Sequence, residues 1–143
     1  MEVLEQVREL CGDYLNRCRQ LELDRKPGDG LLGMGSRPDK DPCHDAFARE
    51  LEAVLKSAED RPSDEIRAAL SYLYRIPTEN RDNLTAYWML LAVHGLTVEL
   101  AAGLNRSDAA ALLAEYREEY PRWERLPAQK RVLAALKAQA AMK

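Results

Sequence analysis

The chain has 143 residues, of which 46% are hydrophobic and 31% are charged, and its net charge is -3 at pH 7. This balance is typical of a globular chain and argues against disorder over most of its length. The small net charge gives, by itself, no sign of a polyanionic partner. Ala, Leu, Glu and Arg dominate while strand-forming residues are sparse, which predicts an all-α fold in one domain.

The charges are distributed unevenly along the chain. Residues 1–120 carry 15 Lys and Arg against 23 Asp and Glu, whereas residues 121–143 carry six against one. This polarity indicates a C-terminal helix that either lies on an acidic body or presents a basic face to a partner.

The chain contains three cysteines, and no secretory leader follows Met1. An odd number of cysteines without a leader favours free thiols in a reducing compartment. We therefore expect a cytoplasmic protein.

The first predicted element is a helix over residues 2–24, because apolar residues recur there at steps of three and four. Residues 26–41 follow with four of the seven glycines and predict a long loop. Gly28, Gly30 and Gly33 in this loop match the spacing G-x-G-x-x-G of dinucleotide-binding turns. That motif requires a strand before it and a helix directly after it, and neither is predicted here, so we interpret the segment as an ordinary loop.

Two further helices are expected before residue 76. Asp41 as the N-cap and Pro42 at the first helical position predict a helix that ends near Glu59. Ser63 is expected to cap the next helix. The inward stripe of that helix is predicted to be Ile66, Ala69, Leu70 and Leu73.

The most hydrophobic segment is 84–104, whose apolar residues fall on nearly every side of a helical wheel. This pattern predicts one continuous helix, capped by Asn83 or an earlier residue and enclosed by the other helices. Its charge-free part, residues 84–98, is shorter than the roughly 20 apolar residues needed to span a bilayer, so we exclude a membrane helix. One face of the helix consists of small or polar residues and is expected either to be closely approached by another helix or to remain open as a groove. That face comprises Trp88, Ala92, Gly95, Glu99 and Ala102.

The last two helices are expected to start at Ser107 and Pro127. The first should pack through Ala110, Leu113 and Tyr116, with Leu112 as a further candidate. The second, 127–143, should bury Val132, Leu133, Leu136 and Ala140. The fold class is therefore all-α, a compact single-domain bundle of about six helices around the segment 84–104.

Few residues suggest catalysis or metal binding. Cys43 beside His44 resembles an activated thiol at a helix start, but neighbours on a helix point about 100° apart, so a cysteine-dependent enzyme using Cys43 is the least favoured alternative. Cys11 and Cys18 lie too far apart on one helix to share a metal ion, and we expect neither a metal nor a cofactor. His94 is interpreted as a core histidine that is hydrogen-bonded to a carbonyl or to a tyrosine such as Tyr87 or Tyr116.

Glu115, Glu118 and Glu119 resemble the carboxylates of a di-metal site, but the histidines of such sites are missing. We therefore interpret these three glutamates as a solvated face.

The segment 116–131 is the strongest candidate for function, because aromatic residues alternate there with cations. Tryptophan and arginine are enriched at the energetic centres of protein interfaces. The candidate partner-binding residues are Arg117, Arg122, Trp123, Arg125, Lys130 and Arg131. These residues predict a non-enzymatic protein-interaction module, such as a regulatory subunit, an adaptor or an inhibitor. The alternative is a small subunit of a larger complex that touches nucleic acid through its basic C-terminal helix, and a homo-oligomer is also open.

Overall fold

The structure is a computed structural model that describes residues 2–24, 44–120 and 126–142, except for the side chains of residues 21–24 and 85. This part of the chain is helical and contains no strand, which confirms the predicted all-α fold class. The α-helices are α1 (Val3–Asp24), α2 (His44–Ser57), α3 (Ser63–Arg75), α4 (Leu84–Ala92), α5 (Arg106–Glu119) and α6 (Pro127–Ala141). Short 3-10 helices are η2 (Thr78–Asn80), η3 (Val93–Thr97) and η4 (Leu100–Gly103).

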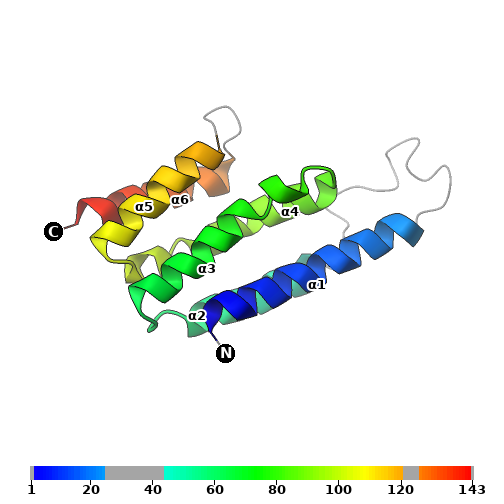
Figure 1. The fold of residues 1–143 in the computed structure, drawn as a ribbon, viewed down its shortest axis with the longest axis horizontal. Coiled ribbons are helices and arrows are strands. Elements are labelled where there is room, and N and C mark those ends of the chain that lie inside the picture. Colours follow the sequence, from blue (N-terminus) through cyan, green and yellow to red (C-terminus); the bar gives the residue numbers. More distant parts are fainter. Residues whose placement is uncertain (1, 25–43, 121–125, 143) are drawn as a thin grey trace.

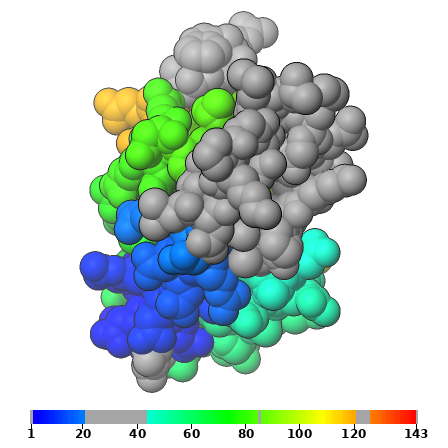
Figure 2. Space-filling model, turned by 90° about the vertical axis from the view of Figure 1, so that its right-hand side faces the viewer, coloured from blue at the N-terminus to red at the C-terminus, as the bar shows by residue number. Residues whose placement is uncertain are grey.

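The helices form three consecutive antiparallel hairpins that lie side by side (Figure 1). The front layer contains α1, α3 and α5, with α3 packed between the other two. The back layer contains α2, the segment from α4 to η4, and α6, and both α2 and α6 pack on η3. An end view in Figure 2 shows the same order, with α1 and α2 in blue and cyan below the green middle hairpin. The middle hairpin therefore joins the two outer hairpins.

The apolar stripes of the first and third helices form much of the core. In α1, Val3, Val7, Cys11, Tyr14 and Cys18 are all buried, as their spacing predicts. The four residues of the predicted stripe in α3, Ile66, Ala69, Leu70 and Leu73, are fully buried. α3 is enclosed because α1, α5 and η3 all pack on it.

The segment 84–104 is not one continuous helix, contrary to the prediction. α4 ends at Ala92, and the chain continues as η3 and η4 with a turn between them. Gly95 and the β-branched Thr97 have low helix propensity, and the Thr97 hydroxyl donates to the carbonyl of His94 at 2.7 Å. This side-chain bond offers the backbone an alternative to regular α-helical pairing.

The predicted helix starts are partly confirmed. The Asn83 side chain accepts from the Ala86 N–H at 3.1 Å, so Asn83 caps α4 as expected. Pro127 is the first residue of α6, also as expected. Ser63 is not the cap of α3, because its hydroxyl bonds to Asp108 instead. The predicted loop 26–41 and the predicted helix start at Asp41 and Pro42 lie outside the described residues.

α5 begins one residue earlier than predicted and turns a different face inward. Asn105 is its N-cap and accepts from the Asp108 N–H at 2.7 Å. Ala109, Leu112 and Tyr116 are buried, whereas Ala110 is exposed and Leu113 is only half-buried. Alanine and leucine surround this helix, so the sequence pattern alone does not distinguish the two faces.

Within the described residues, no helix combines the length and the hydrophobicity that crossing a membrane requires.

Candidate interaction surface

The residues of the candidate segment 116–131 have different environments in the structure. Arg117, Lys130 and Arg131 are exposed, as a partner-binding role requires. Tyr116 is 1% exposed and belongs to the core, as its predicted inward position requires, and Tyr120 is also buried at 0%. The remaining candidates, Arg122, Trp123 and Arg125, lie outside the described residues.

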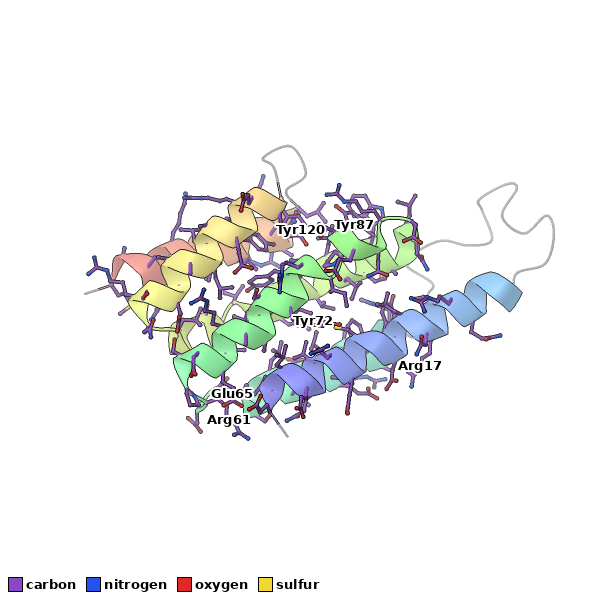
Figure 3. The ribbon with its side chains drawn as sticks, viewed as in Figure 1. Arg17, Arg61, Glu65, Tyr72, Tyr87 and Tyr120 are labelled. Carbon is purple, nitrogen blue, oxygen red and sulfur yellow. The ribbon has the colours of Figure 1, made fainter. Side chains whose placement is uncertain are left out.

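The two tyrosines belong to a buried aromatic cluster with Tyr74 and His94. The ring centroids of Tyr74 and Tyr116 are 4.8 Å apart, and those of His94 and Tyr120 are 5.7 Å apart. The hydroxyl of Tyr120, where α5 ends (Figure 3), donates to the carbonyl of Tyr74. This cluster ties the end of α5 to the middle hairpin and explains why the tyrosines are withdrawn from the surface.

His94 is a satisfied core residue, as the sequence predicts. Its Nε2 lies 3.2 Å from the carbonyl of Leu73 and its Nδ1 lies 3.0 Å from the hydroxyl of Tyr116. Because a carbonyl only accepts, Nε2 carries the proton and Tyr116 donates to Nδ1. Burial lowers the pKa of His94 from 6.5 to about 3, although the bond to the Leu73 carbonyl opposes the shift. The ring is therefore neutral near pH 7.

A second polar network joins the start of α3 to the start of α5. The Ser63 hydroxyl donates to Asp108 Oδ2 at 2.5 Å and accepts from the backbone N–H of Asn105 at 2.7 Å. Arg67 Nη1 lies 3.0 Å from Asp108 Oδ1. The bond from Ser63, and after it the Arg67 guanidinium, hold the pKa of Asp108 below its ordinary value despite partial desolvation. Its role in the structure is to hold two helices together.

The carboxylates of α5 are not simply a solvated face, which corrects the interpretation of Glu115 and Glu119. Glu115 accepts from the Ser71 hydroxyl at 2.8 Å, and Glu119 accepts from the Thr78 hydroxyl at 2.9 Å. Of the three glutamates, only Glu118 is exposed. The side of α5 that faces the middle hairpin therefore uses two of its carboxylates for contacts with that hairpin.

The cations of the third hairpin contrast with those of α3. On α3 and just before it, Arg61, Arg67 and Arg75 lie 3.9, 3.0 and 3.8 Å from the carboxylates of Glu65, Asp108 and Glu115. The first of these pairs lies at the start of α3 (Figure 3). Five exposed cations on α5 and α6, Arg106 at the start of α5 among them, have no such ion pair with a described residue. We call the other four the cationic surface: Arg117, Lys130, Arg131 and Lys137.

The small face of the segment 84–104 is covered at one point and open at another. A Cβ atom placed on Gly95 would lie 3.0 Å from Arg131 Nη2 and 3.5 Å from the Cβ of Ala128, so α6 approaches closely there. Leu84, Trp88 and Ala92 of α4 are exposed, with Leu84 at 64% and Trp88 at 42%. Because they are spaced by four residues they share one side of the helix, and we call them the α4 strip.

The cysteines and histidines form no metal site in the described residues. Cys11 and Cys18 are buried, and burial raises the pKa of the Cys11 thiol to about 12. No group of three or more His, Cys, Asp or Glu side chains that could hold a metal ion occurs in this part of the chain. Cys43 lies outside it.

Comparison of the chain with protein-family models, with curated proteins and with solved structures finds no match.

Proposed function

We propose that this chain is a non-enzymatic protein-interaction module that binds an acidic surface of a protein partner through its cationic surface. Such a module acts as a regulatory subunit, an adaptor or an inhibitor of its partner. The sequence candidates Arg122, Trp123 and Arg125, between α5 and α6, are assigned to the same interface. We also propose that the protein works in the cytoplasm, where a thiol such as that of Cys11 persists.

The observation that supports this proposal is that the four residues of the cationic surface have no ion pair with a described residue. α6 contains Lys130, Arg131 and Lys137 and no acidic residue, although the chain as a whole carries a net charge of -3. Exposed charges that no internal partner uses accelerate encounter with a surface of opposite sign and select against partners of like sign.

A capture experiment with charge-reversal variants tests the proposal. The tagged wild-type chain, the double variant Arg117→Glu/Lys130→Glu and a control variant Arg49→Glu are compared for the proteins that they retain from the native host. Arg49 is also exposed but lies on α2, away from the cationic surface. We expect one defined companion with the wild type and the control, lost in the double variant. A companion that all three retain equally would assign binding to another surface.

Nucleic acid is the second candidate partner, and the absence of acidic residues from α6 favours it over other non-protein partners. Binding to phosphates releases counterions, so affinity for any DNA or RNA should fall steeply as salt rises. Fluorescence anisotropy with a labelled duplex and a labelled single strand at two salt concentrations distinguishes the candidates. Salt-sensitive binding that Lys130→Glu weakens for all sequences alike would favour nucleic acid over protein.

A further inference from the structure

Arg131 of the cationic surface lies against the middle hairpin. A Cβ atom placed on Gly95 would lie 3.0 Å from Arg131 Nη2 and 4.0 Å from its Cζ. The guanidinium therefore lies directly beside the backbone of Gly95 in η3, although Arg131 as a whole is exposed. A side chain at position 95 would begin in the space next to this guanidinium, and glycine leaves that space free.

The helix that carries Arg131 is fixed on the same segment at both of its ends. Near the start of α6, the Cβ of Ala128 would lie 3.5 Å from a Cβ on Gly95, which is an ordinary van der Waals distance. Near the end of α6, the side-chain amide of Gln139 donates to the carbonyl of Leu104 at 2.7 Å. The position of the Arg131 backbone is thus set by packing, and Gly95 limits where the guanidinium can lie.

A guanidinium whose position is restricted binds an anion differently from a free one. Its planar fork forms two parallel hydrogen bonds with a carboxylate, which requires a defined orientation of the plane. A side chain with full rotamer freedom loses that freedom on binding, whereas one that is already restricted loses less. Arg131 has no ion pair with a described residue, so no described carboxylate competes with a partner for it.

We propose that Gly95 is a positioning residue of the cationic surface, because it leaves room on η3 for the Arg131 guanidinium and restricts the orientation in which that group meets a carboxylate of the protein partner. Gly95 acts through Arg131 and not by touching the partner. The inference rests on the proposed function and deepens it. The group that the partner supplies to Arg131 is a carboxylate held by two hydrogen bonds.

A double-mutant cycle tests whether Gly95 acts through Arg131. Binding of a fluorescein-labelled oligoglutamate peptide is measured by fluorescence anisotropy for the wild type, Gly95→Met, Arg131→Ala and the combined variant. Gly95→Met should weaken binding about two- to tenfold, because the displaced guanidinium must be ordered again on binding. The same substitution should have no further effect once Arg131 is alanine, since the two effects are then not additive.

Matched controls separate this role from a structural one. Gly95→Met combined with Lys130→Ala should give the sum of the two single effects, because Gly95 is not expected to act through Lys130. Gly12→Met lies on α1, where a Cβ would meet nothing within 4 Å, and should leave binding unchanged. Circular dichroism melting curves establish that each variant folds. Gly95→Ala is the milder variant, since its Cβ meets the flexible end of Arg131, and it decides the question if Gly95→Met does not fold.

The outcomes of the binding experiment are distinguishable. A wild type that does not bind the peptide would contradict the proposed function, and the role of Gly95 would fall with it. A wild type that binds, with Gly95→Met and Gly95→Ala unchanged, would refute this inference alone. An equal loss in the wild-type and Arg131→Ala backgrounds would also refute it, because Gly95 would then act independently of Arg131.

A second measurement needs no partner. NMR relaxation of the Arg131 Nε–Hε group should show a more restricted side chain than that of Arg117 on α5, and Gly95→Met should change the mobility of Arg131 but not that of Arg117. Equal mobility of the two arginines in the wild type would overturn the positioning role of Gly95 and leave the proposed function standing.

Discussion

His94 shows how burial determines the chemistry of a single side chain. The ring is 0% exposed, both of its nitrogens are hydrogen-bonded, and its pKa is lowered to about 3. A neutral, fully bonded imidazole of this kind holds α3, η3 and α5 together. His94 is thus part of the core, as the sequence predicts.

The lowered pKa of His94 predicts how stability changes with pH. The unfolded chain binds a proton at this histidine near pH 6.5 and the folded protein does not until about pH 3. Because the unfolded state binds more protons between these values, stability is highest above pH 6.5 and falls as pH decreases, by up to about 1.4 kcal/mol per pH unit. Urea unfolding from about pH 7 to about pH 5, where carboxylates stay mostly ionised, measures this slope. His94→Gln should have a distinctly shallower slope, and equal slopes would contradict a buried neutral histidine.

Asp108 provides a second prediction at the level of one residue. Asp108→Asn weakens the bonds with Ser63 and Arg67, so we expect the free energy of unfolding to drop by about 1–3 kcal/mol near pH 7. Glu118→Gln on the same helix is the control and should have little effect, because Glu118 is exposed. Since the pKa of Asp108 is lowered, its stabilisation is present above the ordinary carboxyl pKa and is lost as pH falls. Chemical denaturation of the three proteins at neutral and acidic pH would show the difference between wild type and Asp108→Asn shrink in acid.

At the scale of the element, two glycines of the back layer lie where neighbouring elements approach their backbone closely. Gly95 lets α6 approach η3, and Gly103 lies at the end of η4 beside the buried Ile66. Gly12, by contrast, lies in α1 with nothing within 4 Å of a Cβ atom placed on it. The glycines of the described helices therefore have different roles.

Two glycine substitutions should have opposite effects. Gly12→Ala should stabilise the protein by about 0.5–1 kcal/mol, because alanine restricts the unfolded chain and fits the helix without contact. Gly103→Ala should destabilise it by about 1–2 kcal/mol, since the new Cβ would lie 2.9 Å from Cδ1 of Ile66, which has no exposed surface. Thermal unfolding followed by circular dichroism measures both. A loss of stability in Gly12→Ala would refute the open environment of that residue.

At the scale of the whole molecule, the middle hairpin supports the other two. α3 is flanked by α1 and α5, and η3 is flanked by α2 and α6 (Figure 1). Among the described elements, each outer hairpin has an outer side on which no further helix packs. Local opening should therefore start at the outer hairpins and reach the middle one last.

Hydrogen exchange followed by mass spectrometry tests this order. We expect peptides from α3, around Leu70 and Leu73, to exchange most slowly among the described helices. Leu70→Ala should lower the free energy of unfolding by about 2–5 kcal/mol, because it leaves a cavity in the core. It should also accelerate exchange in all three hairpins, because Leu70 lies on α3, on which both outer hairpins pack. Acceleration confined to the middle hairpin would show that the outer hairpins are stable independently.

The sequence by itself determined the features that depend on local patterns. The periods of three and four residues predicted the buried stripes of α1 and α3. Asn83 and Pro127 predicted the starts of two helices. A histidine inside the most hydrophobic segment predicted a core residue with hydrogen-bond partners. Composition alone predicted an all-α fold. The exposed positions of Arg117, Lys130 and Arg131 also agree with the prediction, because charged residues opposite an apolar stripe face water.

Only the tertiary structure decided what depends on residues distant in the chain. The ending of α4 at Ala92 accompanies contacts of η3 with α3 and α6, and the face of α5 follows from the bonds that Asp108 makes with Ser63 and Arg67. Glu115 and Glu119 bond to residues of α3 and η2, whereas the cationic surface has no ion pair with a described residue, a contrast that no local pattern contains. Such contacts join residues about 40 positions apart, so they contribute to stability only when the hairpins pack together.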